Sequence, residues 1–180
     1  MYHAPCRHTN DRNGAAASAP ADPGGCPHDV RQLGQRPGRD PLAAVEAYFA
    51  EVEKVAAKGP DILAHIDLIK KLNGEGEFFD EEAPRYRAAA LKALSAAKEH
   101  NCLLEVNTGG VYRGYRKDFY PSAWMLEEWN KMGGKVIITS DSHDVSSLTF
   151  GFEEAAAAIK AAGFTSVEVL TGHGFETQEL

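Results

Sequence analysis

The stretch from residue 102 to residue 143, CLLEVNTGGVYRGYRKDFYPSAWMLEEWNKMGGKVIITSDSH, decides the fold of this chain. It opens with a short apolar run, CLLEVN, and nearly closes with another, KVIIT, and each has the length and composition of a buried strand. Between them Ser122 is a suitable helix N-cap, apolar residues recur at helical spacing as far as Met132, and two glycines follow. A strand, a helix and a strand in this order predict two parallel neighbours in one sheet.

The same alternation continues on both sides of this stretch. Upstream, Asp40-Pro41 is typical of a helix start, and the apolar stripe that follows ends at Gly59. The run DILAHIDLI then predicts a buried strand, and PRYRAAALKALSAAKEH predicts a helix. Downstream, GFEEAAAAIKAAG predicts a helix and SVEVL a last strand. We therefore expect an α/β fold in which parallel strands alternate with helices, and the pattern alone is compatible with a doubly wound sheet or a barrel.

The first forty residues differ in kind from the rest, which divides the chain into a leader, residues 1–40, and a body, residues 41–180. The leader holds five prolines and five glycines but no isoleucine, phenylalanine, lysine or glutamate. Such a stretch cannot bury enough apolar surface to offset its ordering entropy, so we expect it to be disordered or not native coding sequence. Its histidines, His3, His8 and His28, lie on no predicted element and are not expected to be ligands.

Composition narrows the class of protein. The net charge of −7 argues against a nucleic-acid-binding surface. No apolar run approaches the roughly 20 residues of a membrane span. The three cysteines have no metal-type spacing, and their odd number without an export signal indicates reduced thiols. We expect a cytoplasmic protein that does not bind nucleic acid or membranes.

Polar residues stand at the carboxyl ends of three successive predicted strands. His65 ends the first, Asn107 ends the second, and Asp141 and His143 follow the third. Because these ends meet on one face of a parallel sheet, the side chains can converge there, and a carboxylate with imidazoles can bind divalent ions. The alternatives are an ordinary turn at TSDSH and a hydrogen-bonded core histidine at His65.

The loop NTGGVYRGYRKDFYPS, residues 107–122, is rich in glycine, arginine and tyrosine and follows a strand directly. Arg113 and Arg116 carry planar, permanently charged guanidinium groups suited to a phosphate, although a solvated surface loop would contain the same residues. Lys70 and Lys71, which lie among many acidic residues, are predicted to be on the surface.

Four segments together resemble the PHP (polymerase and histidinol phosphatase) family, and within it the histidinol-phosphatase branch. They are DILAHIDLIKK, LLEVNTGGVYRGYRKDFYPS, VIITSDSH and FGFEEAAAAIKAAGF. The resemblance implies the C-terminal part of a distorted (β/α)7 barrel with two or three divalent ions, zinc, manganese or iron, at its carboxyl-end mouth.

The resemblance also implies an activity and the residues that carry it. The implied reaction is the hydrolysis of L-histidinol phosphate, a small phosphate ester, to L-histidinol in histidine biosynthesis. His65, Asp141 and His143 match metal ligands, and Asp141 and His143 are in addition the expected catalytic residues. Arg113 matches a phosphate-binding arginine, with Asn107 and Tyr115 expected beside the substrate.

The sequence departs from this family at its beginning, because it has no HxH motif and nothing upstream of residue 41 resembles the first strands. Three retained ligands predict weak metal binding and impaired activity, and an incomplete barrel predicts self-association through exposed strand edges. Two other functions stay open: a PHP phosphoesterase acting on nucleotides, and a non-catalytic fragment.

Overall fold

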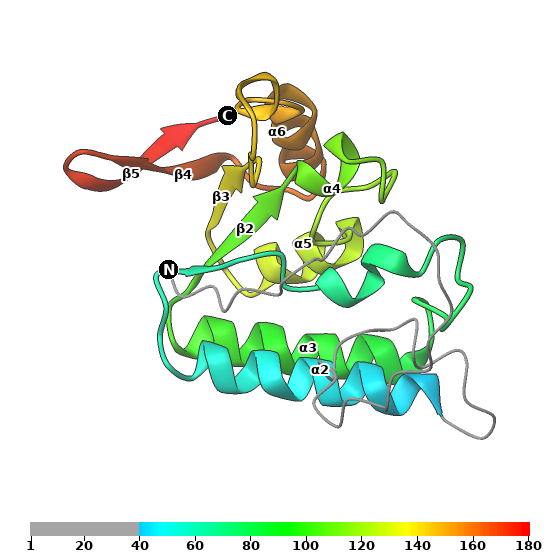
Figure 1. The fold of residues 1–180 in the computed structure, drawn as a ribbon. Helices are drawn as coiled ribbons and strands as arrows, with labels where there is room; N and C mark the ends of the chain where they lie inside the picture. Colours follow the sequence, from blue (N-terminus) through cyan, green and yellow to red (C-terminus); the bar gives the residue numbers. More distant parts are fainter. Residues whose placement is uncertain (1–39) are drawn as a thin grey trace, which may run out of the picture.

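The fold is built on a five-stranded sheet whose spatial order, β1-β2-β3-β4-β5, is the order of the strands in the sequence (Figure 1). The computed structural model describes residues 40–180. The first four strands pair in parallel, and β4 and β5 pair antiparallel. The bounds are β1 (Ile62–Leu63), β2 (Leu103–Asn107), β3 (Val136–Thr139), β4 (Ser166–Thr171) and β5 (Gly174–Glu179).

Helices lie between consecutive parallel strands, as the sequence predicts, and β5 follows β4 without a helix. The α-helices are α2 (Pro41–Ala56), α3 (Pro84–Glu99), α4 (Gly109–Tyr112), α5 (Ala123–Lys131) and α6 (Phe152–Ala161). Two short 3₁₀ helices complete the set, η1 (Leu68–Leu72) and η2 (Val145–Ser147). The predicted helix start at residue 40 is confirmed, because the Asp40 carboxylate accepts a hydrogen bond from the backbone N–H of Leu42 at 3.0 Å.

The strand order decides between the two architectures that the sequence left open. A doubly wound sheet reverses its direction of winding at a switch point, so its strand order cannot follow the sequence throughout. Here each parallel strand is added beside the previous one, and the sheet curls into part of a (β/α) barrel. The predicted fold class is confirmed.

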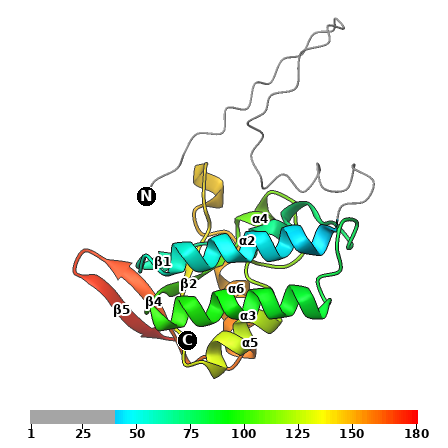
Figure 2. The same ribbon diagram turned by 90° about the horizontal axis from the view of Figure 1, so that it is seen from below.

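The core lies between the sheet and the helices. In both views α2 and α3 lie side by side against the sheet (Figures 1 and 2). Phe49 of α2 meets Tyr86 of α3 edge to face, with ring centroids 5.5 Å apart. Leu104 and Val106 of β2 are fully buried, and all five residues of this central strand are buried, because both of its faces are covered. On the surface, Arg85 of α3 forms ion pairs with Asp40, the N-cap of α2, and with Glu46 of α2.

The first predicted strand is shorter than the sequence indicates. Only Ile62 and Leu63 of the run DILAHIDLI pair with β2, and the chain then turns at His65, whose φ is 30°. Leu68 and Ile69 of the same run lie in η1, because the same aliphatic pattern can bury a short helix as well as a strand.

The prediction that Lys70 is on the surface is wrong. Its side chain is completely buried, with the amine 3.1 Å from Asp67, 2.6 Å from Asp118 and 2.7 Å from the Ser122 hydroxyl. The acidic neighbours that suggested a solvated surface are in part its buried partners. Ser122 begins α5 as predicted, but its hydroxyl binds Lys70 and Asp67 and makes no capping bond.

The predicted last strand, SVEVL, is followed by one more. The polar run GFETQE forms β5, which pairs along the whole of β4. Its sequence has no apolar alternation, because neither face of β5 enters the core. The β4–β5 hairpin extends away from the rest of the molecule in both views (Figures 1 and 2).

The leader of residues 1–40, with its three histidines, falls outside the described residues except for Asp40. Among residues 40–180, no helix combines the length and apolar character needed to cross a membrane.

Candidate functional site

The candidate site lies at the carboxyl ends of β2 and β3, which are adjacent and in register. Asn107 stands beside Thr139 as the last residue pair of the two strands. The chain leaves β2 into α4 and leaves β3 into the loop that contains Asp141 and His143. Parallel strands therefore bring the predicted residues of two distant sequence segments to one edge, as expected for sites in α/β proteins.

Arg113 and Asp141 are brought into direct contact. One terminal nitrogen of the Arg113 guanidinium donates to Asp141 Oδ2 at 2.8 Å, and the other donates to the Asp141 main-chain carbonyl at 3.0 Å. Both side chains are only partly buried. A guanidinium carries five N–H donors, so three remain for a ligand besides the two bound here.

Gly109 makes room for this pair. A Cβ atom at this position would lie 2.6 Å from an Arg113 terminal nitrogen and 2.6 Å from the Ser140 carbonyl oxygen. The glycine at the start of α4 thus lets the guanidinium cross its backbone and reach the loop that follows β3.

The backbone is strained at two of the predicted ligands. His65 and Asp141 adopt φ values of 30° and 47°, in the left-handed region that residues with a Cβ seldom enter. Strain of this kind costs on the order of 1–3 kcal/mol and collects at functional sites, where the surrounding structure holds it in place. It supports the assignment of both residues to a site but does not specify the chemistry.

Glu105 is a candidate residue that the sequence analysis did not single out. Its carboxylate is nearly buried on β2 and accepts hydrogen bonds from the His65 backbone N–H at 2.7 Å, the Thr139 hydroxyl at 2.6 Å and the Asn107 amide at 3.2 Å. It ties the ends of β1, β2 and β3 together. The signal was present in LLEVN, where one acidic residue interrupts an otherwise apolar strand.

The described residues do not fit a metal ion in this arrangement. Within residues 40–180, no three histidine, cysteine, aspartate or glutamate side chains are grouped so that they could hold one. One oxygen of Asp141 is taken by Arg113, and both oxygens of Glu105 accept hydrogen bonds. His143 is exposed on its loop, and His65 follows β1 at the margin of the sheet. Metal binding by His65, Asp141 and His143 stays a prediction.

The other predicted contacts to substrate have different surroundings. Asn107 is buried, and its amide oxygen accepts a hydrogen bond from the Gly109 N–H at 2.9 Å, which holds the backbone at the start of α4. Tyr115 is exposed with the Lys71 amine 4.3 Å from its ring centroid. Substrate contact by Asn107 and Tyr115 stays a prediction.

Arg116, the second arginine of the loop, has its guanidinium bound to other groups of the protein. Its guanidinium contacts Glu81 at 3.0 Å and Asp118 at 3.0 Å and donates to the Lys70 carbonyl at 3.1 Å. Burial disfavours its charge, yet the two carboxylates raise the pKa of Arg116 above its ordinary value. Arg113 therefore has the more available guanidinium of the two.

The fold is similar to that of solved histidinol phosphatase structures. One, assigned as the histidinol phosphatase HisK of Listeria monocytogenes, aligns with a TM-score of 0.55 at 20% identity, over 62% of this chain and 43% of that chain. Another, histidinol phosphate phosphatase HisK of Lactococcus lactis in complex with zinc, L-histidinol and phosphate, aligns with a TM-score of 0.56 at 18% identity, over 78% of this chain and 53% of that chain.

This chain thus spans about half the length of those two chains. No protein-family model and no curated protein sequence matches it. At such identities the similarity establishes the fold, and residues 40–180 share the architecture of part of these phosphatases.

Proposed function

We propose that this chain is a phosphomonoesterase of the histidinol-phosphatase type, whose substrate is L-histidinol phosphate. The observation that carries the proposal is the Arg113–Asp141 pair at the carboxyl ends of two adjacent parallel strands. A fixed, partly exposed guanidinium at this edge is suited to a phosphate dianion. The likeness in fold to histidinol phosphatases supports the choice of ester.

The reaction requires water to attack phosphorus, the ester P–O bond to break, and a proton from the water to reach the departing alkoxide. Arg113 would bind the phosphoryl oxygens and offset the charge that they gather. Asp141 holds two of the guanidinium N–H groups and so fixes its direction. His143, exposed on the same loop, is the predicted proton carrier, together with the Asp141 carboxylate.

A divalent ion, zinc, manganese or iron, is the cofactor that the resemblance implies. Because no three ligands are grouped within residues 40–180, we expect low metal affinity and weak activity for this chain. The structure offers no basis for a step that passes through a bound ion.

The test is phosphate release from L-histidinol phosphate by the full chain, with and without added Zn²⁺ or Mn²⁺. Arg113→Lys keeps the charge but removes the planar fork, so we expect kcat/KM to fall about 10-fold or more. Arg87→Lys, in an exposed ion pair on α3, is the matched control and should leave the rate unchanged. An absence of phosphate release under every metal condition, or equal rates for Arg113→Lys and the parent, would refute the proposal.

A second candidate is a non-catalytic fragment with a vestigial site, which the lack of a three-ligand group in residues 40–180 favours. Metal content after dialysis separates the two. Retained stoichiometric zinc or manganese supports an enzyme, and a metal-free chain without phosphatase activity supports the fragment.

A further inference from the structure

We propose that a cavity at the amino-terminal ends of the strands is a second ligand site, whose ligand is a free α-amino acid with a large apolar side chain. This site goes beyond the proposed function, because it lies at the opposite end of the sheet from Arg113 and Asp141 and involves no phosphate chemistry. The cavity has a volume of about 440 Å³, which is in the range of small-molecule sites.

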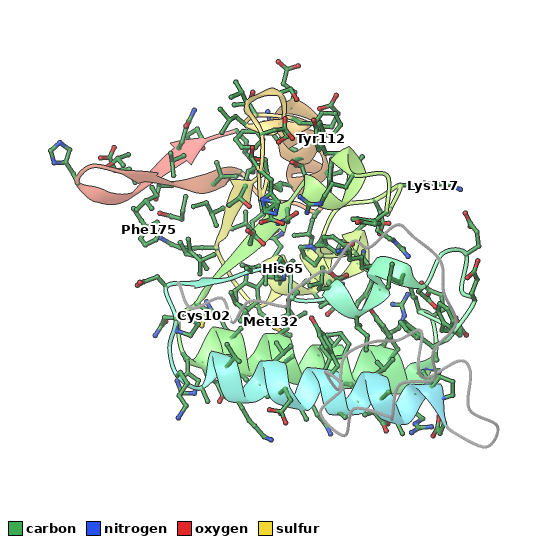
Figure 3. The ribbon with its side chains drawn as sticks, in the orientation of Figure 1. His65, Cys102, Tyr112, Lys117, Met132 and Phe175 are labelled. Atoms are coloured by element: carbon green, nitrogen blue, oxygen red, sulfur yellow. The ribbon has the colours of Figure 1, made fainter. Side chains whose placement is uncertain are left out.

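The cavity lies where the chain enters the sheet. Asp61, Cys102 and Lys135 line it, and they immediately precede β1, β2 and β3. Glu168 of β4 and Phe175 of β5 contribute the remainder of this wall. Figure 3 shows Cys102 and Phe175 on the side of the sheet away from α4, the helix that carries the candidate site. The cavity is therefore separate from that site.

A fixed ion pair forms part of the cavity wall. The Lys135 amine lies 2.8 Å from Glu168 Oε1, and the Thr177 hydroxyl donates to the same oxygen at 2.8 Å. The Glu168 side chain is only 6% exposed, and its other oxygen, Oε2, accepts no hydrogen bond from the described residues. Buried carboxylate oxygens normally have a donor, so Oε2 is suited to an N–H group of a ligand.

The ion pair selects the class of ligand by charge. Glu168 attracts a lone cation while Lys135 repels it, and a lone anion meets the reverse. A ligand that carries both charges close together gains from both ends when it lies head to tail against the pair. An α-amino acid at neutral pH carries an ammonium and a carboxylate on one carbon. Its ammonium would donate to Glu168 Oε2, and its carboxylate would accept from Lys135.

The rest of the lining suits the other parts of such a ligand. The Lys98 amine donates to the Gly133 carbonyl at 2.6 Å and keeps two further N–H donors for a carboxylate. Leu103 and Phe175 add apolar surface that a large apolar side chain would cover. An ion pair that only joined β3 to β4 would need no cavity beside its unused carboxylate oxygen.

Three matched probes test the site by binding alone. L-Phenylalanine carries both charges, 2-phenylethylamine lacks the carboxylate, and 3-phenylpropionate lacks the ammonium, while all three share the same ring. We expect the full chain to bind L-phenylalanine about 10-fold or more tightly than either singly charged probe, as measured by calorimetry or NMR titration.

Two substitutions remove one end of the ion pair each. Glu168→Gln keeps the shape of the side chain and should lower the affinity for L-phenylalanine about 10-fold without lowering that for 3-phenylpropionate. Lys135→Met should also lower the affinity for L-phenylalanine, without lowering that for 2-phenylethylamine. A variant that had simply lost its fold would lose affinity for every probe, and NMR spectra establish that each variant is folded.

Glu128 and Lys131 on α5 form a matched control pair outside the cavity. Their amine-to-carboxylate distance is also 2.8 Å, and the Lys131 side chain is 65% exposed against 64% for Lys135. Glu128→Gln and Lys131→Met should bind all three probes as the parent does. Equal affinity of the parent for the three probes, no binding of L-phenylalanine, or unchanged L-phenylalanine affinity in both cavity variants overturns the amino-acid site. Phosphate release is measured at the opposite end of the sheet, so the proposed function fails separately.

Discussion

At the scale of single residues, the loop between β2 and α5 depends on the buried amine of Lys70. The amine contacts Asp67, Asp118 and the Ser122 hydroxyl, and it also donates to the Phe119 carbonyl at 3.1 Å. One cation therefore joins the segment after β1 to the end of the loop that carries Arg113. Removing it would leave the buried Asp67 carboxylate without its counter-charge in a dry environment.

Lys70→Met should lower the free energy of unfolding by about 3–5 kcal/mol, because it breaks a buried pair and leaves the partner charged. Urea denaturation measures the loss. Lys71→Met is the matched control: its amine contacts only the exposed ring of Tyr115 among the described residues, and the change should stay below about 1 kcal/mol. Equal effects of the two substitutions would contradict the importance of the buried amine.

The same network predicts how the free energy of unfolding changes at low pH. Burial opposes ionisation of Asp118, but Lys70 and Arg116 keep its pKa below the ordinary value of 3.8. A group whose pKa is lower in the folded protein adds stability above its unfolded pKa and loses it as pH falls through the folded value. The contribution should therefore be complete above about pH 5 and fade below pH 3.8.

Comparing the parent with Asp118→Asn by urea unfolding between pH 2 and pH 7 checks this sign. The stability difference should be constant near neutrality and shrink in acid, since the other carboxylates are common to both proteins. A difference that stays constant down to pH 2, or widens there, would show that Asp118 is not held ionised by its partners.

Gly109 supports a prediction about the site itself. In Gly109→Ala the new methyl group would lie 2.6 Å from Arg113 and from the Ser140 carbonyl, so the guanidinium must leave its place across α4. We expect the affinity for methylphosphonate, a non-hydrolysable probe of the phosphate position, to fall about 10-fold as measured by NMR titration, because the displaced guanidinium no longer meets it. Gly172→Ala, where the methyl group would have no neighbour within 4 Å, should bind as the parent does.

At the scale of elements, helices and central strands were predictable, and the margins of the sheet were not. The helices at α2, α3, α5 and α6 and the strands β2 and β3 follow from periodicity and caps, because each buries one defined face. The length of β1 was overestimated, because the chain turns out of the sheet at His65, within an aliphatic run. β5 was missed because an exposed edge strand needs no apolar pattern.

The candidate site was predictable to the extent that it depends on strand ends. Arg113 and Asp141 came from separate motifs and are in contact. Glu105 was not predicted because its signal is a single acidic residue in an apolar strand, with no second residue at a diagnostic spacing. The burial of Lys70 was not predicted because it depends on tertiary contacts between distant segments. How His65 and His143 stand relative to the carboxylates depends on loop geometry, which residue type and spacing do not determine.

At the scale of the whole molecule, the sheet presents its inner face to solvent beyond β3. Leu170 and Phe175 are directly opposite each other in the β4–β5 ladder and are 60% and 39% exposed. Cross-strand partners share a face, so the pair forms an apolar surface on the open side of the hairpin. We therefore predict that the chain self-associates through this surface and the neighbouring strand edge.

Leu170→Lys together with Phe175→Lys should shift the chain toward the monomer in a sedimentation-velocity concentration series. The reason is that charge on an exposed strand face opposes association without disturbing the core. Val145→Lys, which replaces an even more exposed apolar residue on η2, is the control and should leave the association unchanged. A parent chain that is monomeric throughout the series would disprove the association.

The antiparallel pairing of β5 has a consequence for how such a barrel could be completed. The hydrogen-bonding edge of β4 that a further parallel strand would need is already occupied along its length by β5. An additional strand must therefore pair with the free edge of β5, pair with the free edge of β1, or displace β5 from β4. The β4–β5 hairpin thus prevents addition of a further parallel strand beside β4. The free edge of β1 stays open to pairing with another strand.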